Sequence, residues 1–401
     1  MLHYFSVSNF QSFFEESTIS FEVPRSKAMK SRKWVRKSRA DDVLIATATS
    51  LFGANGSGKT AILKALQFLE WFTKDSFSDL EPDELIPLNQ HFASPTDAVS
   101  EFEILMEDSN GELWRYELSL TPKMVMHEAL YRRSQRFRYV FIRDFDKSTS
   151  SYKVKQQGFG FPSREARHIR PNVSFLSAAR QFGVDEARAV LPFDLISNLP
   201  SANSDLRDNL ITRRLAEISD INQFGKNEKL REQIISEVRK WDVGIKDIRV
   251  EEIPNAGNVS ARYRLLGVHE TDEGIIGLIP FDEESGGTRA AFHLIRKLIY
   301  ALEQGAVAVI DELDSELHPE LALNLASMFD DSKLNAFGAQ LIFSTHASIL
   351  LDHFERFHAY FIEKVDNESI AVRGDDITGL RADDNLRAKY ESGALGAVPQ
   401  L

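Results

Sequence analysis

The most informative stretch of this chain is Gly53-Ala54-Asn55-Gly56-Ser57-Gly58-Lys59-Thr60. It fits the pattern G-x-x-x-x-G-K-[ST], follows an apolar, β-branched run at residues 43–52, and leads into an apolar helix pattern at residues 61–72. The octamer alone would also fit a Gly/Ser turn, but strand, glycine-rich turn and helix in this order predict a phosphate-binding loop. Backbone N–H groups and the positive end of the helix dipole then face phosphate oxygens. We expect Lys59 to reach the β- and γ-phosphates and the Thr60 hydroxyl to bind Mg²⁺.

Length and composition bound the class of protein. The chain has 401 residues, 43% of them hydrophobic, no cysteine, and a net charge of −12. This is enough for one large domain, or two to three average ones, with a real core. No apolar run reaches the ~18–20 residues of a membrane span, and residues 1–7 lack the pattern of a signal peptide. The absence of cysteine excludes disulfides and thiolate metal sites, so we expect a globular, cytoplasmic protein that is not a wholly basic, nucleic-acid-coating one.

Hydrophobic periodicity divides the chain into three segments. In residues 1–180, the runs 2–7 and 18–23 predict a hairpin, four runs between 98 and 144 predict an antiparallel meander, and residues 172–177 predict a further strand. Residues 181–243 show helical spacing and predict a helical insertion. Strand patterns return at 245–253, 261–266 and 275–281, within the segment 244–401.

Two stretches are locally basic although the chain is acidic. Residues 24–40 hold eight lysines and arginines together with Trp34. Such a loop can bind a nucleic-acid backbone and stack a base, dock on an acidic partner, or remain a mobile solvated loop. The second cluster consists of Arg132, Arg133, Arg136 and Arg138. It offers another binding surface, unless these arginines simply solvate an edge strand.

A second group of motifs follows residue 283. Ser285-Gly286-Gly287 precedes an amphipathic helix pattern at 290–301, and a glycine-rich turn that opens a helix can bind anions. The apolar strand pattern at 306–310 ends in Asp311 and Glu312, which we expect to face the ligand crevice. There Asp311 would bind Mg²⁺ and Glu312 would orient and deprotonate the attacking water, although two surface carboxylates would read the same way. The apolar run at 340–345 similarly places His346 at a strand end, where phosphates are expected.

In this order, the motifs resemble the Walker A, signature, Walker B and switch-histidine motifs of ABC-type ATPases. More narrowly, the chain resembles the soluble branch with SMC and RecF proteins and the OLD nucleases, and most of all the AAA-family, AbiL-like ATPases of bacterial anti-phage and abortive-infection loci. Residues 9–13, 284–288, 311–319 and 390–399 carry this last resemblance, which covers nearly the whole chain. The signature reads Glu-Ser-Gly-Gly-Thr instead of Leu-Ser-Gly-Gly-Gln, and His318 replaces a common Asp, so a transporter subunit is disfavoured.

The resemblance implies an α/β fold: an ABC-type P-loop ATPase head with an antiparallel β lobe and a helical insertion. It implies ATP and Mg²⁺ as ligands, Lys59, Glu312 and His346 as catalytic residues, and a nucleotide sandwich of at least two protomers. A glutamine loop is also implied, with Gln181 as first candidate for the metal site and Gln90 as second. The other implied residues are Gly53, Asn55, Gly56, Ser57, Gly58 and Thr60 around the nucleotide, Ser285, Gly286 and Gly287 toward a second protomer, and Thr60 and Asp311 at the metal.

Three functions remain open at this point. The first is an anti-phage ATPase that acts as sensor or scaffold and controls a separate effector protein. The second is a DNA-repair or DNA-end-binding ATPase, for which duplex DNA would stimulate hydrolysis. The third is a transporter ATPase, which would need a membrane partner. About fifty residues follow His346, too few for an appended catalytic domain of typical size, so we expect any effector to be a separate protein.

Overall fold

The computed structural model describes residues 1–24, 33–133, 135–189, 194–200, 224, 227–240, 244–253, 262–315, 317–381 and 384–397. The chain groups into two units: residues 1–202, 301–313 and 326–401 form the first, and residues 203–300 and 314–325 form the second. This division cuts across the predicted segments 1–180, 181–243 and 244–401, because the chain leaves the first unit and returns to it twice. Along the described ranges, no helix is both long and apolar enough to cross a lipid bilayer.

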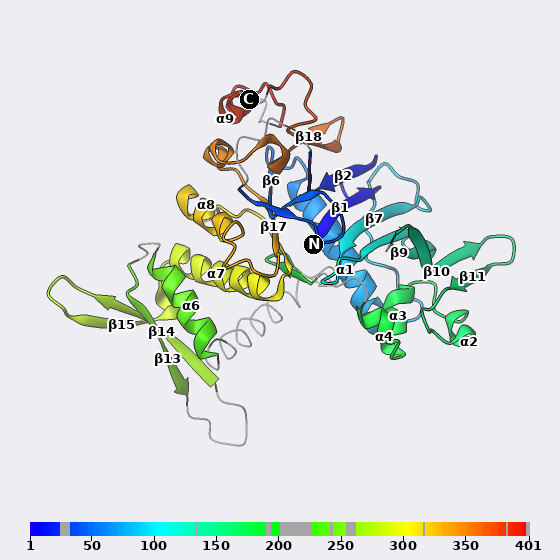
Figure 1. Ribbon diagram of the computed structural model, residues 1–401, viewed down its shortest axis with the longest axis horizontal. Coiled ribbons are helices and arrows are strands. Elements are labelled where there is room, and N and C mark those ends of the chain that lie inside the picture. The colour runs from blue at the N-terminus through cyan, green and yellow to red at the C-terminus, as the bar shows by residue number, and fades with distance from the viewer. Residues whose placement is uncertain are drawn as a thin grey trace. The chain divides into compact units, whose positions relative to one another are not determined.

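A mainly parallel sheet forms the centre of the first unit (Figure 1). Its strands lie in the order β12-β16-β17-β6-β18-β19, and every neighbouring pair is parallel except β18 and β19. All residues of β6, β16 and β17 are buried, and apolar residues make up most of each strand, as expected of parallel strands covered on both faces. The strands are β12 (Leu195–Ser197), β16 (Val307–Ile310), β17 (Gln340–Ser344), β6 (Ala48–Phe52), β18 (Ala359–Val365) and β19 (Glu368–Arg373).

An antiparallel sheet of seven strands makes up the second layer of this unit. It confirms the predicted hairpin, as β1 and β2, and the predicted meander, as β7 to β10. The strands lie in the order β11 (Ser151–Gln156), β10 (Phe137–Asp146), β9 (Val125–Arg133), β8 (Leu113–Leu120), β7 (Ser100–Glu107), β1 (Leu2–Ser8) and β2 (Ser17–Ser20). A small sheet of β3 (Glu22–Val23), β5 (Leu44–Ala46) and β4 (Val35–Lys37) adjoins it in sequence.

Helix α1 (Lys59–Asp79) joins the two sheets through one hydrophobic core. Its Phe68 ring stacks at 5.2 Å on Phe102 of β7, and the same buried cluster contains Val309 and Ile342 of the central sheet. The helix continues to Asp79, beyond the predicted 61–72, and in this added part Thr73 and Ser76 are buried and Phe77 packs against the core. The core therefore holds the helix that follows the glycine-rich loop. The mixed α/β class with an antiparallel lobe is confirmed.

Two predicted elements of the first unit are wrong. The predicted strand at 172–177 is the start of helix α3 (Phe175–Gln181), because Ser174 caps it and Glu128 of β9 accepts the Phe175 N–H at 2.7 Å. That carboxylate comes from a distant strand, so the local pattern cannot reveal it. Residues 195–197 fall in the predicted helical insertion but form β12, a strand too short to show a period. Shorter elements are α2 (Ser163–Ala166), α4 (Asp185–Ala189) and α9 (Leu386–Glu391).

The second unit combines helices with a three-stranded antiparallel sheet. In helix α6 (Glu228–Arg239) the predicted apolar stripe is buried, with Ile234, Ile235 and Val238 at most 9% exposed. The predicted helical positions Leu206, Leu210, Leu215, Ile218 and Trp241 lie outside the described residues. The sheet consists of β13 (Asp247–Ile253), β14 (Arg262–Glu270) and β15 (Ile276–Pro280), and helices α7 (Gly286–Gln304) and α8 (Pro319–Ser327) connect the two units along the chain.

Candidate active site

The loop at residues 53–58 follows β6 directly and requires glycine at two positions for steric reasons. A Cβ at Gly53 would collide with the carbonyl oxygen of Ile362, and one at Gly58 would collide with the Ser369 hydroxyl. Gly58 also adopts a φ of 116° as the N-cap of α1, and Gly56 has a φ of 76°. The loop thus follows a tight path that side chains would block, as a phosphate-binding loop must.

Two segments far away in the sequence hold this loop from outside. The Ser369 hydroxyl of β19 lies 2.6 Å from the Ser57 carbonyl oxygen and 2.7 Å from the Ser12 hydroxyl. The Ser369 backbone N–H also donates to the Ser12 carbonyl at 2.7 Å. The bend at residues 9–13, on which part of the family resemblance rests, is therefore a support of the loop.

Lys59 lies folded over the loop to which it belongs. Its Nζ donates to the carbonyl oxygens of Gly53 at 2.8 Å and Ala54 at 3.0 Å, and the residue is buried. The exposed residues of the loop are Asn55 and Gly56, whereas Ser57 is buried. A positive charge is thereby kept within the loop, where phosphate oxygens would replace the two carbonyls as its partners.

Asp311 connects the three strand ends at this edge of the central sheet. The Thr60 hydroxyl donates to Asp311 Oδ2 at 2.8 Å, and the Ser344 hydroxyl donates to Oδ1 at 2.5 Å. Thr60 lies in the first turn of α1, after β6, whereas Asp311 follows β16 and Ser344 ends β17. A hydroxyl and a carboxylate in contact are hard oxygen donors that fit Mg²⁺, which binds few protein ligands and keeps several waters.

The backbone around Asp311 and Glu312 is fixed by side chains that the sequence patterns did not single out. Asn198, just after β12, accepts the Asp311 N–H and donates to the Asp311 carbonyl, both at 2.8 Å. Ser344 Oγ accepts the Glu312 N–H at 2.7 Å. Glu312 has a φ of 52°, a conformation that is rare for a residue other than glycine and clusters at functional sites. In the sequence, Asn198 and Ser344 could have been found as site residues only because each is a polar residue at the end of a short apolar run.

His346 lies on the exposed segment that follows β17. The preceding Thr345 is buried, and its N–H donates to the Leu51 carbonyl of β6 at 3.1 Å. The Ala347 N–H donates to the Thr345 hydroxyl at 3.0 Å. The histidine is therefore held at the same edge of the sheet as the loop and Asp311.

The first glutamine candidate, Gln181, lies far along α1 from Thr60, one of the two candidate metal ligands. Helix α3 packs beside the later part of α1, since the Ser177 hydroxyl donates to the Lys74 carbonyl at 2.9 Å. Lys74 follows Lys59 by 15 residues, about 22 Å at the rise of an α-helix. Gln181, at the end of α3, is exposed beside this remote part of α1, which argues against its predicted metal role. Gln90 donates its amide to the Ala98 carbonyl at 2.6 Å, next to the start of β7.

The signature residues belong to the second unit. Ser285 precedes α7, and its hydroxyl accepts the Thr288 N–H at 3.1 Å, which caps the helix. Gly286 and Gly287 form the first turn of α7. His318 stands immediately before α8, where its Nδ1 accepts the Glu320 N–H at 3.3 Å. This histidine therefore serves as a helix cap.

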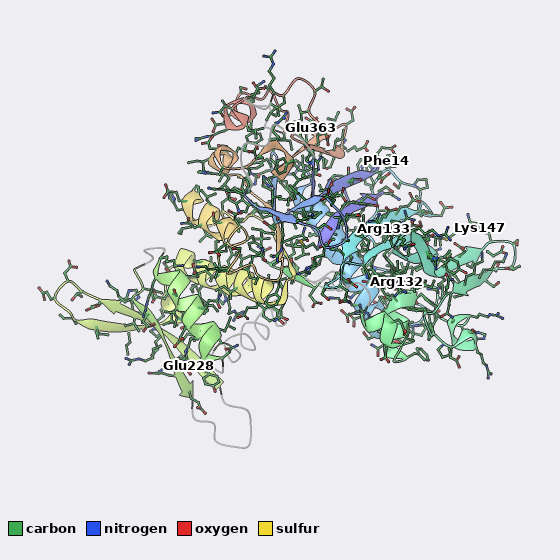
Figure 2. The ribbon with its side chains drawn as sticks, viewed as in Figure 1. Phe14, Arg132, Arg133, Lys147, Glu228 and Glu363 are labelled. Atoms are coloured by element: carbon green, nitrogen blue, oxygen red, sulfur yellow. The ribbon has the colours of Figure 1, made fainter. Side chains whose placement is uncertain are left out.

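The basic stretches differ from what a stacking surface requires. Trp34 is only 3% exposed, its ring packs at 4.6 Å on Phe354, and its indole N–H donates to the Ala326 carbonyl. It therefore cannot stack a base in this conformation. Arg25, Lys27, Lys30 and Arg32 lie outside the described ranges. Arg132 and Arg133 lie next to each other at the end of β9 (Figure 2). Arg132 is 3.7 Å from Glu112, and Arg133 pairs with Asp41.

Comparison with known proteins gives one family. A model of the family described as "AAA domain, putative AbiEii toxin, Type IV TA system" matches residues 48–352. The matched part begins with β6 and includes the loop, Asp311, Glu312 and His346. No curated protein matches the chain at a significant level.

Several solved structures are similar over most of their length. An SMC head bound to the C-winged helix domain of ScpA has a TM-score of 0.47 and 13% identity, covering 92% of this chain and 96% of that one. An SMC head with an extended coiled coil, bound to the C-terminal domain of ScpA from Pyrococcus furiosus, has a TM-score of 0.43 and 11% identity. The match covers 92% of this chain and 95% of that one. The recombination mediator protein RecF has a TM-score of 0.34 and 10% identity, and the match covers 93% of this chain and 98% of that one.

Proposed function

We propose, from the premise that this chain belongs to the AAA-domain family whose model matches residues 48–352, that it binds ATP with Mg²⁺ and hydrolyses the γ-phosphate. One observation carries this proposal: the Asp311 carboxylate contacts the Thr60 hydroxyl, at the start of the helix that follows the glycine-rich loop. A carboxylate, a hydroxyl and a lysine at the entrance of one helix are what binding of a nucleotide phosphate chain requires.

Each residue then has one role. Gly53, Asn55, Gly56, Ser57 and Gly58 provide the backbone N–H groups around the phosphates, with Lys59 as the charge on the β- and γ-phosphates. Thr60 and Asp311 hold Mg²⁺, which when bound neutralises charge on the phosphates. Glu312 takes the proton of the attacking water, and His346 contacts the γ-phosphate.

The test removes the loop lysine. Lys59→Ala should weaken ATP binding and abolish phosphate release without unfolding the chain, because the carbonyls to which Lys59 donates, those of Gly53 and Ala54, belong to the glycine-rich loop rather than to the hydrophobic core. Lys64→Ala on the same helix is the control and should keep both activities. Phosphate release by Lys59→Ala at the wild-type rate would refute the assignment.

We further propose that two protomers assemble head to tail, with Ser285, Gly286 and Gly287 of one on the nucleotide of the other. A hydroxyl and a glycine turn at the start of the 19-residue helix α7 support this, because such a turn binds anions. Ser285→Arg should keep ATP binding but lose turnover. A mixture with Lys59→Ala should regain activity through one intact composite site, provided that mixed oligomers form; if they form without activity, the sandwich is wrong.

For the cell, we propose an ATPase that acts in the cytoplasm as sensor or scaffold in anti-phage defence and controls a separate effector protein. The family description, which names a toxin of toxin–antitoxin systems, supports this over the alternative of a DNA-repair or DNA-end-binding ATPase. Loss of phage protection in Glu312→Gln, together with co-purification of the neighbouring gene product, is the expected result. Hydrolysis that duplex DNA stimulates strongly, with no protein partner, would favour the alternative.

A further inference from the structure

Strand β15 of the second unit exposes an apolar edge. It lies outermost in the sheet β13-β14-β15, next to β14 (Figure 1). The exposed fractions are 61% for Ile275, 63% for Ile276, 41% for Leu278 and 37% for Ile279. Alternate backbone N–H and C=O groups of an outermost strand point away from its neighbour and remain available to another strand. Contiguous exposed apolar residues beside such groups mark an interaction site.

Other edges in the same molecule carry charges that oppose strand addition. The opposite edge of this sheet, β13, contains Arg249, Glu251 and Glu252. The outer strand β11 of the antiparallel sheet exposes Lys153 and Lys155. Edge charges of this kind prevent pairing with other chains. Between residues 275 and 279, β15 has none, so its edge is open for a partner strand.

Both ends of β15 are acidic. Asp272 and Glu273 precede the strand, Asp282 and Glu283 follow it, and all four are exposed. Arg289 lies near Asp282 and Glu283, and its guanidinium donates to the Asp282 carbonyl at 3.3 Å. The charge is therefore negative at the Asp272 end of the apolar edge. At the Asp282 end it is predominantly negative, because Arg289 offsets part of it.

This charge pattern opposes a second copy of the chain as occupant. A two-fold axis through Gly277 would pair β15 antiparallel with itself and place Asp272 opposite Asp282 of the other copy. Like charges directly opposite each other on paired strands are destabilising. An apolar strand with lysine or arginine at its ends would instead gain favourable electrostatic interactions with the acidic residues at both ends of β15.

We propose that β15 is a docking edge that adds an extended apolar segment, flanked by basic residues, from a separate protein. Main-chain hydrogen bonds would supply affinity, and the acidic ends would select the partner. The identification of this partner as the effector rests on the proposed function. The docking chemistry itself is independent of that function.

The test uses synthetic peptides and the full chain without nucleotide. The probe is a fluorescent peptide with the core Val-Thr-Val-Ile-Val and two lysines at each end, and the matched probe has glutamates instead. Fluorescence anisotropy should show binding of the lysine peptide and affinity for the glutamate peptide lower by about tenfold or more. Ile276→Lys, which adds an edge charge at an exposed position, should weaken the lysine peptide about tenfold or more. Val365→Lys, at an exposed apolar position of β18 in the first unit, should not change it.

Three results would overturn the proposal: no binding of the lysine peptide, equal affinity for both peptides, or no effect of Ile276→Lys. A drop in oligomer mass of Ile276→Lys by light scattering would also overturn it, since a second copy would then cover the edge. Circular dichroism confirms that both variants fold. Because no ATP is present, peptide binding by a chain without ATPase activity would uphold the docking edge and reject the proposed function, and the reverse result would do the opposite.

Discussion

Replacement of Ser344 by alanine tests how the strand ends work together. The Ser344 hydroxyl donates to Asp311 at 2.5 Å and accepts the Glu312 N–H at 2.7 Å. The side chain is fully buried, so water cannot replace these bonds without rearrangement. Ser344→Ala therefore frees the Asp311 carboxylate to rotate and leaves the Glu312 backbone without its partner.

The size of the effect follows from the two bonds. A hydrogen bond to a charged group contributes about 1.5–3 kcal/mol, and one to a neutral backbone group about 0.5–1.5 kcal/mol. If about 2.7 kcal/mol of this is lost in the transition state, kcat falls by about 10²-fold. ATP affinity should change only a few-fold, because Lys59 and the loop backbone are untouched.

Ser50→Ala provides a matched control. Ser50 lies on the neighbouring strand β6, opposite Phe343, and is equally buried. Its hydroxyl donates to the His358 carbonyl at 3.1 Å rather than to Asp311. Ser50→Ala should lose about 0.5–1.5 kcal/mol of unfolding free energy and Ser344→Ala about 2–4.5 kcal/mol, but only Ser344→Ala should lose turnover. The assay is phosphate release at saturating ATP and Mg²⁺, with chemical denaturation for stability.

This role of the Ser344 hydroxyl is refuted if Ser344→Ala keeps kcat within about threefold of Ser50→Ala at equal ATP saturation. It also fails if the variant loses ATP binding as severely as Lys59→Ala, since the hydroxyl would then support the loop rather than the carboxylate.

Three further predictions concern other parts of the chain. Glu312→Gln should lower kcat by ~10²-fold or more while ATP still binds, and Asp314→Asn should not; the reverse outcome in phosphate-release assays would move the base to Asp314. Glu128→Ala should lower the free energy of unfolding by about 3–5 kcal/mol, because it leaves Arg143 buried beside it at 3.7 Å without its carboxylate; a denaturation loss below about 1 kcal/mol would contradict this. Hydrogen bonding to Glu117, opposed by burial and helped by Asp144, raises the pKa of His127 from 6.5 to about 9. Because the folded pKa is above the unfolded one, this stabilisation is full below about pH 6.5 and is lost as pH rises through about 9, so His127→Gln should flatten the decline in stability over that window.

Local patterns were sufficient wherever a residue's role depends on its immediate neighbours. The apolar runs before the octamer at 53–60, before Asp311 and before His346 each predicted a strand with a polar end. Buried parallel strands need continuous apolar residues, and turns between strands need glycine or short polar residues, so both are visible in one sequence. The meander β7 to β10 was found for the same reason.

The tertiary structure decided what depends on residues distant in the sequence. The first turn of α3 is helical rather than extended because Glu128, 47 residues earlier, accepts its Phe175 N–H. Gln181 is remote from Thr60, a candidate metal ligand, because α3 packs beside the later part of α1. Trp34 is a core residue because Phe354 covers it. Asn198 and Ser344 hold the Asp311 region only because β12, β16 and β17 are neighbours in one sheet, an order that sequence periodicity leaves open since pairing is set by packing over long range.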